Sequence, residues 1–222
     1  MSCWGLGNNG QLGNGQTFDY ANPTYSNVVN VKPIMIISGG DSNCVLLDNG
    51  TAMCWGDNNY GQLGDGTTTN QLSPVLIDHS FEFVDVVTGE YHSCAIIDDG
   101  SAMCWGYNYY GQLGDGTTTD SNTPVAVSLP AGRTATALAL GGSHSCAILD
   151  DGSVMCWGYN GYGQLGDGTT TYSSIPVAVG LPAGSTATAL ALGSFHSCAI
   201  LDDGSAMCWG AVSYTHLRAH ET

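Results

Sequence analysis

Short apolar runs alternate along this chain with clusters of glycine, proline, serine and aspartate, and the whole pattern recurs at a period of about fifty residues. The clearest unit has four apolar runs, which begin at Pro124, Ala137, His144 and Ser153. Each run has the length of a strand, and turn-forming residues separate it from the next run. No segment sustains a helical period. The pattern therefore predicts an all-β fold made of repeated units of four antiparallel strands.

The last two runs of each unit predict a β-hairpin whose register can be derived. Asp98-Asp99-Gly100 has the composition of a three-residue turn with a left-handed glycine in third place. With this turn, Cys94 lies directly opposite Cys104. The same arrangement recurs in the other hairpins and pairs Cys44 with Cys54, Cys146 with Cys156, and Cys198 with Cys208.

Residues that face each other across two strands are close enough for a disulfide. We therefore expect four structural disulfides, and these favour an oxidising compartment. Reduced cysteines that fill small apolar sites are the alternative. A zinc site is less favoured, because one hairpin supplies only two thiolates.

The motif Cys-Trp-Gly begins at Cys3, Cys54, Cys104, Cys156 and Cys208, and four of these copies continue into Gly-Gln-Leu-Gly. From Gly141 through Thr170 the complete string is G-x-x-H-S-C-A-I-L-D-D-G-S-x-M-C-W-G-x-N-x-x-G-Q-L-G-D-G-T-T. It resembles the repeat of the regulator of chromosome condensation family, in the form found in bacterial and environmental sequences. The resemblance covers residues 1–210 and implies a β-propeller. The family's usual propeller has seven blades, so we expect a partial propeller of about four four-stranded blades.

The repeat divides the chain into a partial unit 1–38, units of about 39–88, 89–140 and 141–192, and a partial unit 193–210. Residues 211–222 abandon the pattern, and we expect them to be a non-native or disordered tail on what is a fragment of a longer protein.

The charge balance narrows the classes of partner. Aspartate and glutamate number 19, whereas the basic residues are Lys32, Arg133 and Arg218, and the formal net charge is −16. A surface that follows a phosphate backbone needs clustered lysine and arginine, so nucleic-acid binding is disfavoured. An anionic membrane surface would repel the chain. No apolar run is long enough to cross a bilayer, so membrane insertion is not expected.

The histidines and tryptophans look chemically active until the copies are aligned. His92, His144 and His196 each precede Ser-Cys at one repeat position, where the first hairpin has Asn43. A residue present in every unit serves the fold, and we expect these histidines to hydrogen-bond a neighbouring turn. The tryptophans are expected to pack between neighbouring sheets; they are Trp4, Trp55, Trp105, Trp157 and Trp209. No catalytic constellation emerges, and no cofactor is expected beyond weak surface calcium at the Asp-Gly turns.

The tyrosines that flank Gly-Gln-Leu-Gly are the better candidates for binding. Tyr107, Tyr109 and Tyr159 occupy positions that vary between units, so we predict contact with a partner. Three others share one repeat position and are expected to be structural; these are Tyr60, Tyr110 and Tyr162. More generally, function should lie where the copies differ, in residues 17–38, 70–90, 120–136 and 172–188.

These features predict a non-enzymatic propeller scaffold that binds another protein or a cell-surface polymer. The paired cysteines favour an extracellular or cell-surface location, with the cytoplasm as the alternative. The family resemblance implies two other functions, guanine-nucleotide exchange on a small GTPase and inhibition of an enzyme by a secreted propeller. The shared motif belongs to the scaffold, so no residue can be assigned to either of them.

Overall fold

The computed structural model describes residues 2–25 and 32–211, and within these ranges the regular elements are strands only. The predicted all-β class is confirmed. The expected tail begins at Ala211, and its remaining residues lie outside the described part of the chain.

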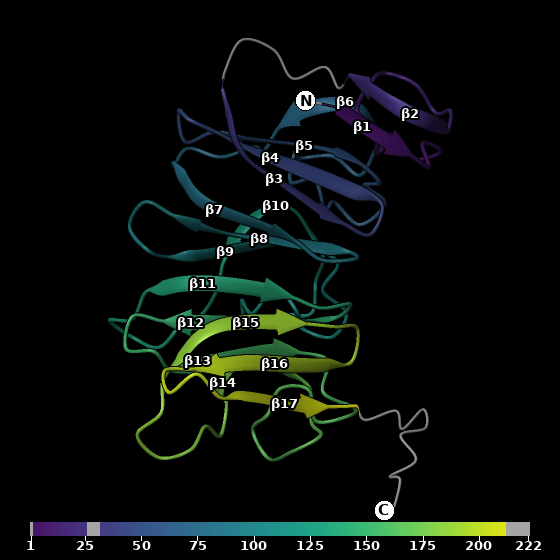
Figure 1. Cartoon of the computed structure of the whole chain (residues 1–222). Helices are drawn as coiled ribbons and strands as arrows, with labels where there is room; N and C mark the ends of the chain where they lie inside the picture. Colours follow the sequence, from purple (N-terminus) through teal and green to yellow (C-terminus); the bar gives the residue numbers. More distant parts are fainter. Residues whose placement is uncertain (1, 26–31, 212–222) are drawn as a thin grey trace, which may run out of the picture.

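Three four-stranded antiparallel sheets form the body of the molecule, each from consecutive strands (Figure 1). The first contains β3 (Pro33–Gly39), β4 (Ser42–Leu47), β5 (Ala52–Gly56) and β6 (Gln71–Leu76). The second contains β7 (Phe83–Thr88), β8 (His92–Ile97), β9 (Ala102–Gly106) and β10 (Ser121–Ala126). The third contains β11 (Ala135–Leu140), β12 (His144–Leu149), β13 (Val154–Gly158) and β14 (Ser173–Ala178).

A smaller sheet flanks this body at either end. At the N-terminal end β1 (Ser2–Gly5) pairs with β2 (Tyr20–Tyr25). At the C-terminal end β15 (Ala187–Leu192), β16 (His196–Leu201) and β17 (Ala206–Gly210) form a three-stranded sheet. The sheets stack in chain order with the two termini at opposite ends, so the array is an open, partial propeller as predicted (Figure 1). Each sheet begins one strand earlier than the sequence units, at Phe83 rather than Gly89 in the second sheet.

The predicted hairpin register is confirmed in every copy. Cys94 lies opposite Cys104, and Gly100 has the left-handed φ of +83° that the turn requires. The other pairs face each other in the same way, and the structure joins all four by disulfides: Cys44–Cys54, Cys94–Cys104, Cys146–Cys156 and Cys198–Cys208. Cys3 is unpaired.

The core lies between successive sheets rather than within one. Neighbouring strand residues point to opposite faces, so Cys104 and Trp105 of β9 face different neighbours. The first cystine, Cys44–Cys54, packs in one cluster with Trp105 of the following sheet. The second cystine packs in the same way with Trp157, and both tryptophans are fully buried. Each sheet thus presents a cystine to the sheet after it and a tryptophan to the sheet before it.

Removing one buried disulfide should lower the free energy of unfolding of the protein. Cys94→Ala with Cys104→Ala opens a loop of ten residues, and we expect the free energy of unfolding to fall by about 2–3 kcal/mol in urea titrations. Cys3→Ser is the control, because Cys3 carries no disulfide. An equal fall in the free energy of unfolding of both variants would show that the Cys94–Cys104 disulfide does not stabilise the fold.

Candidate binding surface

A backbone carbonyl joins each pair of neighbouring sheets. The carbonyl of Gln62 accepts the indole N–H of Trp105 at 2.9 Å and the hydroxyl of Ser93 at 2.8 Å. Gln112 and Gln164 do the same for the tryptophan and serine of the next sheet. The Gly-Gln-Leu-Gly motif therefore fastens its own sheet to the one that follows.

The last glycine of that motif lies directly against the tryptophan. A Cβ on Gly114 would come within 2.7 Å of Trp157 Nε1, and its φ is +70°. Any side chain would both clash and strain the backbone, which accounts for glycine at this place.

The buried histidines also link neighbouring sheets, but here the donor lies on the earlier sheet and the acceptor on the later one. Ser145 uses its one proton on the carbonyl of Gln112, so His92 Nε2 donates to Ser145 Oγ at 2.8 Å. His144 makes the same bond to Ser197. Burial lowers the pKa of His92 to about 3 and that of His144 to about 4, with a smaller contribution from the neighbouring histidine. Both side chains are therefore neutral, and their partner is a serine on a strand of the next sheet rather than the turn expected from the sequence.

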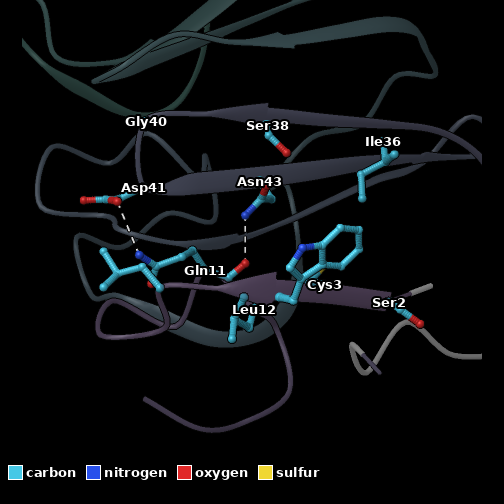
Figure 2. A pocket seen from close by; sticks show the side chains of 11 residues that line it. Ser2, Cys3, Gln11, Leu12, Ile36, Ser38, Gly40, Asp41 and Asn43 are labelled. Carbon is cyan, nitrogen blue, oxygen red and sulfur yellow. Dashed lines mark hydrogen bonds between the residues drawn. The ribbon is translucent and has the colours of Figure 1, made fainter. Parts of the chain in front are cut away.

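The first hairpin departs from this arrangement, and the residue at the histidine position is Ser42, not Asn43. Ser42 faces Gly56 just as His92 faces Gly106, whereas Asn43 faces the tryptophan as Ser93 does. Asn43 Nδ2 donates to the carbonyl of Gln11 at 2.8 Å, as Figure 2 shows. Asparagine thus replaces the serine, because both can donate to that carbonyl.

An asparagine organises each long loop that follows Cys-Trp-Gly. Asn108 Nδ2 donates to the carbonyls of Thr117 and Thr119, while its Oδ1 accepts the backbone N–H of Leu113. Asn58 and Asn160 hold their loops by the same contacts, and all three asparagines are fully buried. The loops are therefore internally braced, and the tyrosines beside each asparagine project from a fixed support.

These loops lie together at one end of the sheets. We call this end the loop face; it is formed by residues 57–70, 107–120 and 159–172 and by the turns at 40–41, 89–91, 141–143 and 193–195. The hairpin turns and the connections between sheets lie at the other end, the turn face.

A continuous row of aromatic rings crosses the loop face. Neighbouring rings have centroids 4.7 to 6.4 Å apart, within the range of favourable aromatic contacts. We call this set the aromatic ladder; it comprises Tyr60, Tyr91, Tyr107, Tyr109, Tyr110, Tyr159, Tyr162, Tyr172 and Phe195.

The ladder crosses every junction between the three four-stranded sheets and the C-terminal three-stranded sheet, which follows them as the fourth. Tyr60 of the first sheet contacts Tyr107 of the second at 4.7 Å. Tyr110 of the second contacts Tyr159 of the third at 4.9 Å, and Tyr162 contacts Phe195 of the fourth at 5.3 Å. Tyr109 is 67% exposed and Tyr162 is 55% exposed, whereas Tyr107, Tyr110 and Tyr159 are half-buried. The ladder therefore lies at the surface, with its junction rings partly covered by their neighbours.

The predicted contact residues Tyr107, Tyr109 and Tyr159 all lie in this ladder. The ladder also contains the tyrosines that repetition had marked as structural: Tyr60, Tyr110 and Tyr162. Sequence reasoning missed Tyr91, Tyr172 and Phe195. Tyr91 and Phe195 each stand directly before the repeated histidine. An aromatic residue at this repeat position is the sequence signal that could have identified them. Of the variable segments, 172–188 contributes Tyr172 to the ladder, at its first residue, and 70–90 ends beside Tyr91.

The surroundings of three ladder tyrosines raise the pKa of their hydroxyls. Burial raises the pKa of Tyr107 and of Tyr159, and neighbouring tyrosines add to the effect. A hydrogen bond to Glu90 raises the pKa of Tyr91. These three rings therefore stay neutral and keep a hydroxyl donor at the ring edge.

Carboxylates flank one end of the ladder. Asp41, Asp57 and Glu90 line a hollow of about 290 Å³ together with Tyr91. Asp120 lies near enough to Tyr107 to raise the pKa of its phenol. A second hollow of about 390 Å³ shares Gly40 and Asp41 with it and lies between Cys3, Gln11 and Asn43 at the N-terminal end (Figure 2).

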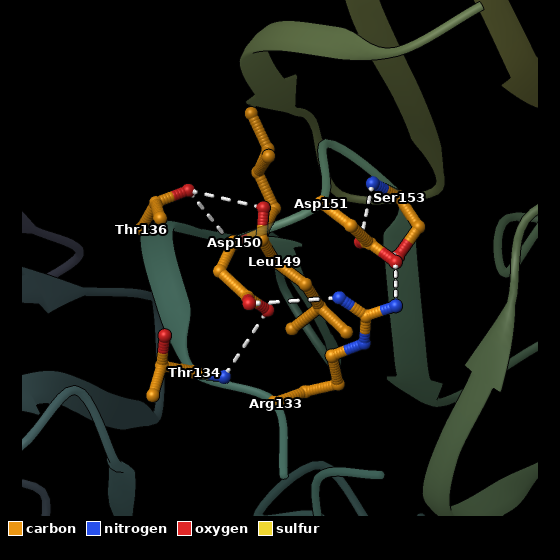
Figure 3. Close-up of polar contacts among 8 residues, drawn as sticks. Arg133, Thr134, Thr136, Leu149, Asp150, Asp151 and Ser153 are labelled. Carbon is orange, nitrogen blue, oxygen red and sulfur yellow. Dashed lines mark hydrogen bonds and ion pairs between the residues drawn. The ribbon is translucent and has the colours of Figure 1, made fainter.

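The described basic side chains lie at the other end of the sheets. Arg133 on the turn face forms ion pairs with Asp150 at 3.5 Å and with Asp151 at 2.5 Å (Figure 3). Lys32 precedes β3 and also lies at the turn face, where its carbonyl accepts the N–H of Asp48. Within residues 2–25 and 32–211, the loop face therefore carries carboxylates and aromatic rings without lysine or arginine.

The Asp-Gly turns use their carboxylates internally. Asp99 accepts the N–H of Ser101, and Asp65 accepts that of Thr67. Within the described ranges, no group of three or more histidine, cysteine, aspartate or glutamate side chains is placed to share a metal ion. Weak surface calcium stays a prediction. The described residues also include no helix that could cross a membrane.

Comparison with known proteins places this architecture in a family. The model of the RCC1-like domain matches residues 1–221. The chain is 33% identical over 204 residues to the human E3 ubiquitin-protein ligase HERC2, covering 90% of this chain and 4% of that protein. It is 30% identical over 211 residues to the ultraviolet-B receptor UVR8 of Arabidopsis thaliana, covering 93% of this chain and 48% of the receptor. The chain thus spans less than half the length of either relative.

Solved structures agree on the fold. Human WBSCR16 superposes with a TM-score of 0.75 at 24% identity, over 86% of this chain and 50% of that one. Prp20p from Saccharomyces cerevisiae superposes with a TM-score of 0.57 at 20% identity, over 94% of this chain and 65% of that one. The chain belongs to the RCC1-like domain family.

Proposed function

We propose that this chain is a non-enzymatic interaction module and that it binds a partner protein through the aromatic ladder. The observation that carries the proposal is a continuous row of exposed and half-buried rings, which crosses every junction from the first four-stranded sheet to the C-terminal three-stranded sheet. Tyrosine is enriched at protein interfaces because it supplies rigid amphipathic area at a small entropic cost. The braced loops add to this advantage, since a preorganised surface loses little freedom on binding.

Substitution on the two faces tests the proposal. Tyr107→Ser, Tyr109→Ser and Tyr159→Ser together should abolish capture of the partner protein on immobilised chain, while far-ultraviolet circular dichroism stays unchanged. The matched control is Tyr25→Ser, which removes an exposed tyrosine outside the ladder. A partner retained equally by the wild type and by the ladder variant would contradict the proposal.

The location is a separate part of the proposal. Four cystines support an extracellular or cell-surface setting, because such bonds persist in oxidising compartments. Titration of free thiols in protein recovered from its native source is the test. One reactive thiol, that of Cys3, is expected. Nine reactive thiols would point to the cytoplasm instead.

The two alternative functions have their own assays. Nucleotide release from a panel of small GTPases tests exchange activity, and inhibition of candidate secreted enzymes tests the inhibitor function. Either activity, if it survives replacement of the ladder tyrosines, would assign the function to another surface.

A further inference from the structure

We infer that the aromatic ladder recognises an arginine-rich segment of its partner; this inference rests on the proposed function and names the chemistry of the ligand. The rings alone would suit many ligands. The distribution of charge around them narrows the choice to a cation.

The charges beside the ladder are negative. Glu90 and Asp41 both raise the pKa of Tyr91, and Asp120 contributes to the raised pKa of Tyr107. Asp41, Asp57 and Glu90 border one hollow beside these rings. An anionic ligand would meet repulsion here, whereas a cation gains both a carboxylate and a ring face.

Among the described residues, no cation of this chain lies near the ladder. Both basic residues in the described part of the chain lie at the turn face, where Arg133 is already paired with Asp150 and Asp151. No described lysine or arginine is available to neutralise the carboxylates beside the ladder. These carboxylates accept hydrogen bonds from neutral groups, as Asp57 does from Gln62 and Asp41 from Gln11. A cationic partner would therefore meet uncompensated negative charge.

The chemistry at one end of the ladder favours one type of cation. There a ring and a carboxylate lie side by side, as at Tyr91 and Glu90. A guanidinium can stack on an aromatic ring while it hydrogen-bonds a carboxylate, and an ammonium group lacks the planar fork for this. The rings continue from Tyr60 to Phe195 across four sheets, so an extended segment can place successive arginines along them.

A labelled peptide of about nine arginines is a direct probe of this chemistry, with fluorescence anisotropy as the measurement. We expect binding that weakens as salt is raised, weaker binding of the matching lysine peptide, and none of the matching glutamate peptide. Tyr109→Ser and Tyr159→Ser should each weaken binding at least about fivefold, because each removes a cation–π contact. Tyr25→Ser should leave it unchanged.

A pair of variants with the same loss of charge separates a site from general attraction. Glu90→Gln lies beside the ladder, whereas Asp98→Asn lies on the turn face. We expect Glu90→Gln to weaken binding of the arginine peptide severalfold and Asp98→Asn to change it less than about twofold. Equal effects of the two variants would overturn the inference, since binding would then follow net charge alone.

Other outcomes overturn the inference and leave the proposed function standing. Ladder-dependent capture of a protein without binding of the arginine peptide would show that the partner uses different chemistry. Binding of a neutral cello-oligosaccharide in place of the peptide would show that the rings stack on sugars. A third outcome would contradict both the proposed function and the inference. In it, capture of the partner does not depend on the ladder tyrosines, and the arginine peptide binds at another surface.

Discussion

Replacing Trp105 by alanine is expected to lower the free energy of unfolding by about 3–5 kcal/mol. Trp105 is fully buried between the first and second sheets, and its indole N–H donates to the carbonyl of Gln62. The substitution removes a large apolar surface, leaves a cavity and deletes one of the two bonds to that carbonyl. Urea unfolding followed by far-ultraviolet circular dichroism measures the loss.

The chain contains a matched control for this variant. Trp4 occurs in the same Cys-Trp-Gly motif but is 63% exposed. Trp4→Ala should change the free energy of unfolding by no more than about 0.5 kcal/mol, as is usual for a surface substitution. Equal falls in the free energy of unfolding of the two variants would mean that the tryptophan stabilises its own strand and does not stabilise the contact between sheets.

Mild acid should destabilise the protein through its buried histidines. The pKa of His92 falls from an ordinary 6.5 to about 3 on folding, and that of His144 falls to about 4. Below pH 6.5 the unfolded chain therefore binds protons that the folded chain does not bind. Each histidine then lowers the free energy of unfolding by about 1.4 kcal/mol per pH unit, down to its folded pKa. At pH 5 the two together should cost about 4 kcal/mol relative to neutral pH.

The physical cause of this effect is visible at Nδ1. The Nε2–H of each histidine is used on a serine, and among the described residues Nδ1 has no hydrogen-bond partner. Protonation at Nδ1 would bury an unpaired charge. The carboxylates of Asp99, Asp151 and Asp203 have lowered pKa values, so their contribution is lost below pH 3.8, outside this window.

Unfolding measured between pH 7 and pH 5 checks this prediction. His92→Asn with His144→Asn is the control, because asparagine keeps an N–H donor for the serine but does not titrate. The wild type should lose stability with falling pH, whereas the double variant should keep only the smaller loss from His79, whose pKa desolvation also lowers. Parallel curves would assign the acid sensitivity to other groups.

The local structure of each hairpin could be predicted from the sequence because its causes are local. Alternation along the strands and the Asp-Asp-Gly turn together determine which residues face each other, and Cys94 opposite Cys104 follows directly. The contacts between sheets could not be derived in this way. The serine that His92 meets is 53 residues away, and its identity depends on how two sheets pack.

The binding surface also could not be fully predicted from the sequence, because repetition alone does not reveal burial. The repeated position of Tyr60 predicts a structural role, and in the structure this side chain is 38% exposed and contacts Tyr107 of the next sheet. In a stacked array, a residue that repeats on the surface lines up with its copies and builds an extended face. Repetition therefore distinguishes the core from the surface only when burial is known.

The most direct test of the binding surface is hydrogen–deuterium exchange of the whole chain with and without a saturating arginine peptide. We expect protection in the loops that carry the ladder, at 57–70, 107–120 and 159–172, and no change at the hairpin turns 98–100 and 150–152. Protection of those turns, or of neither face, would contradict the assignment of binding to the aromatic ladder.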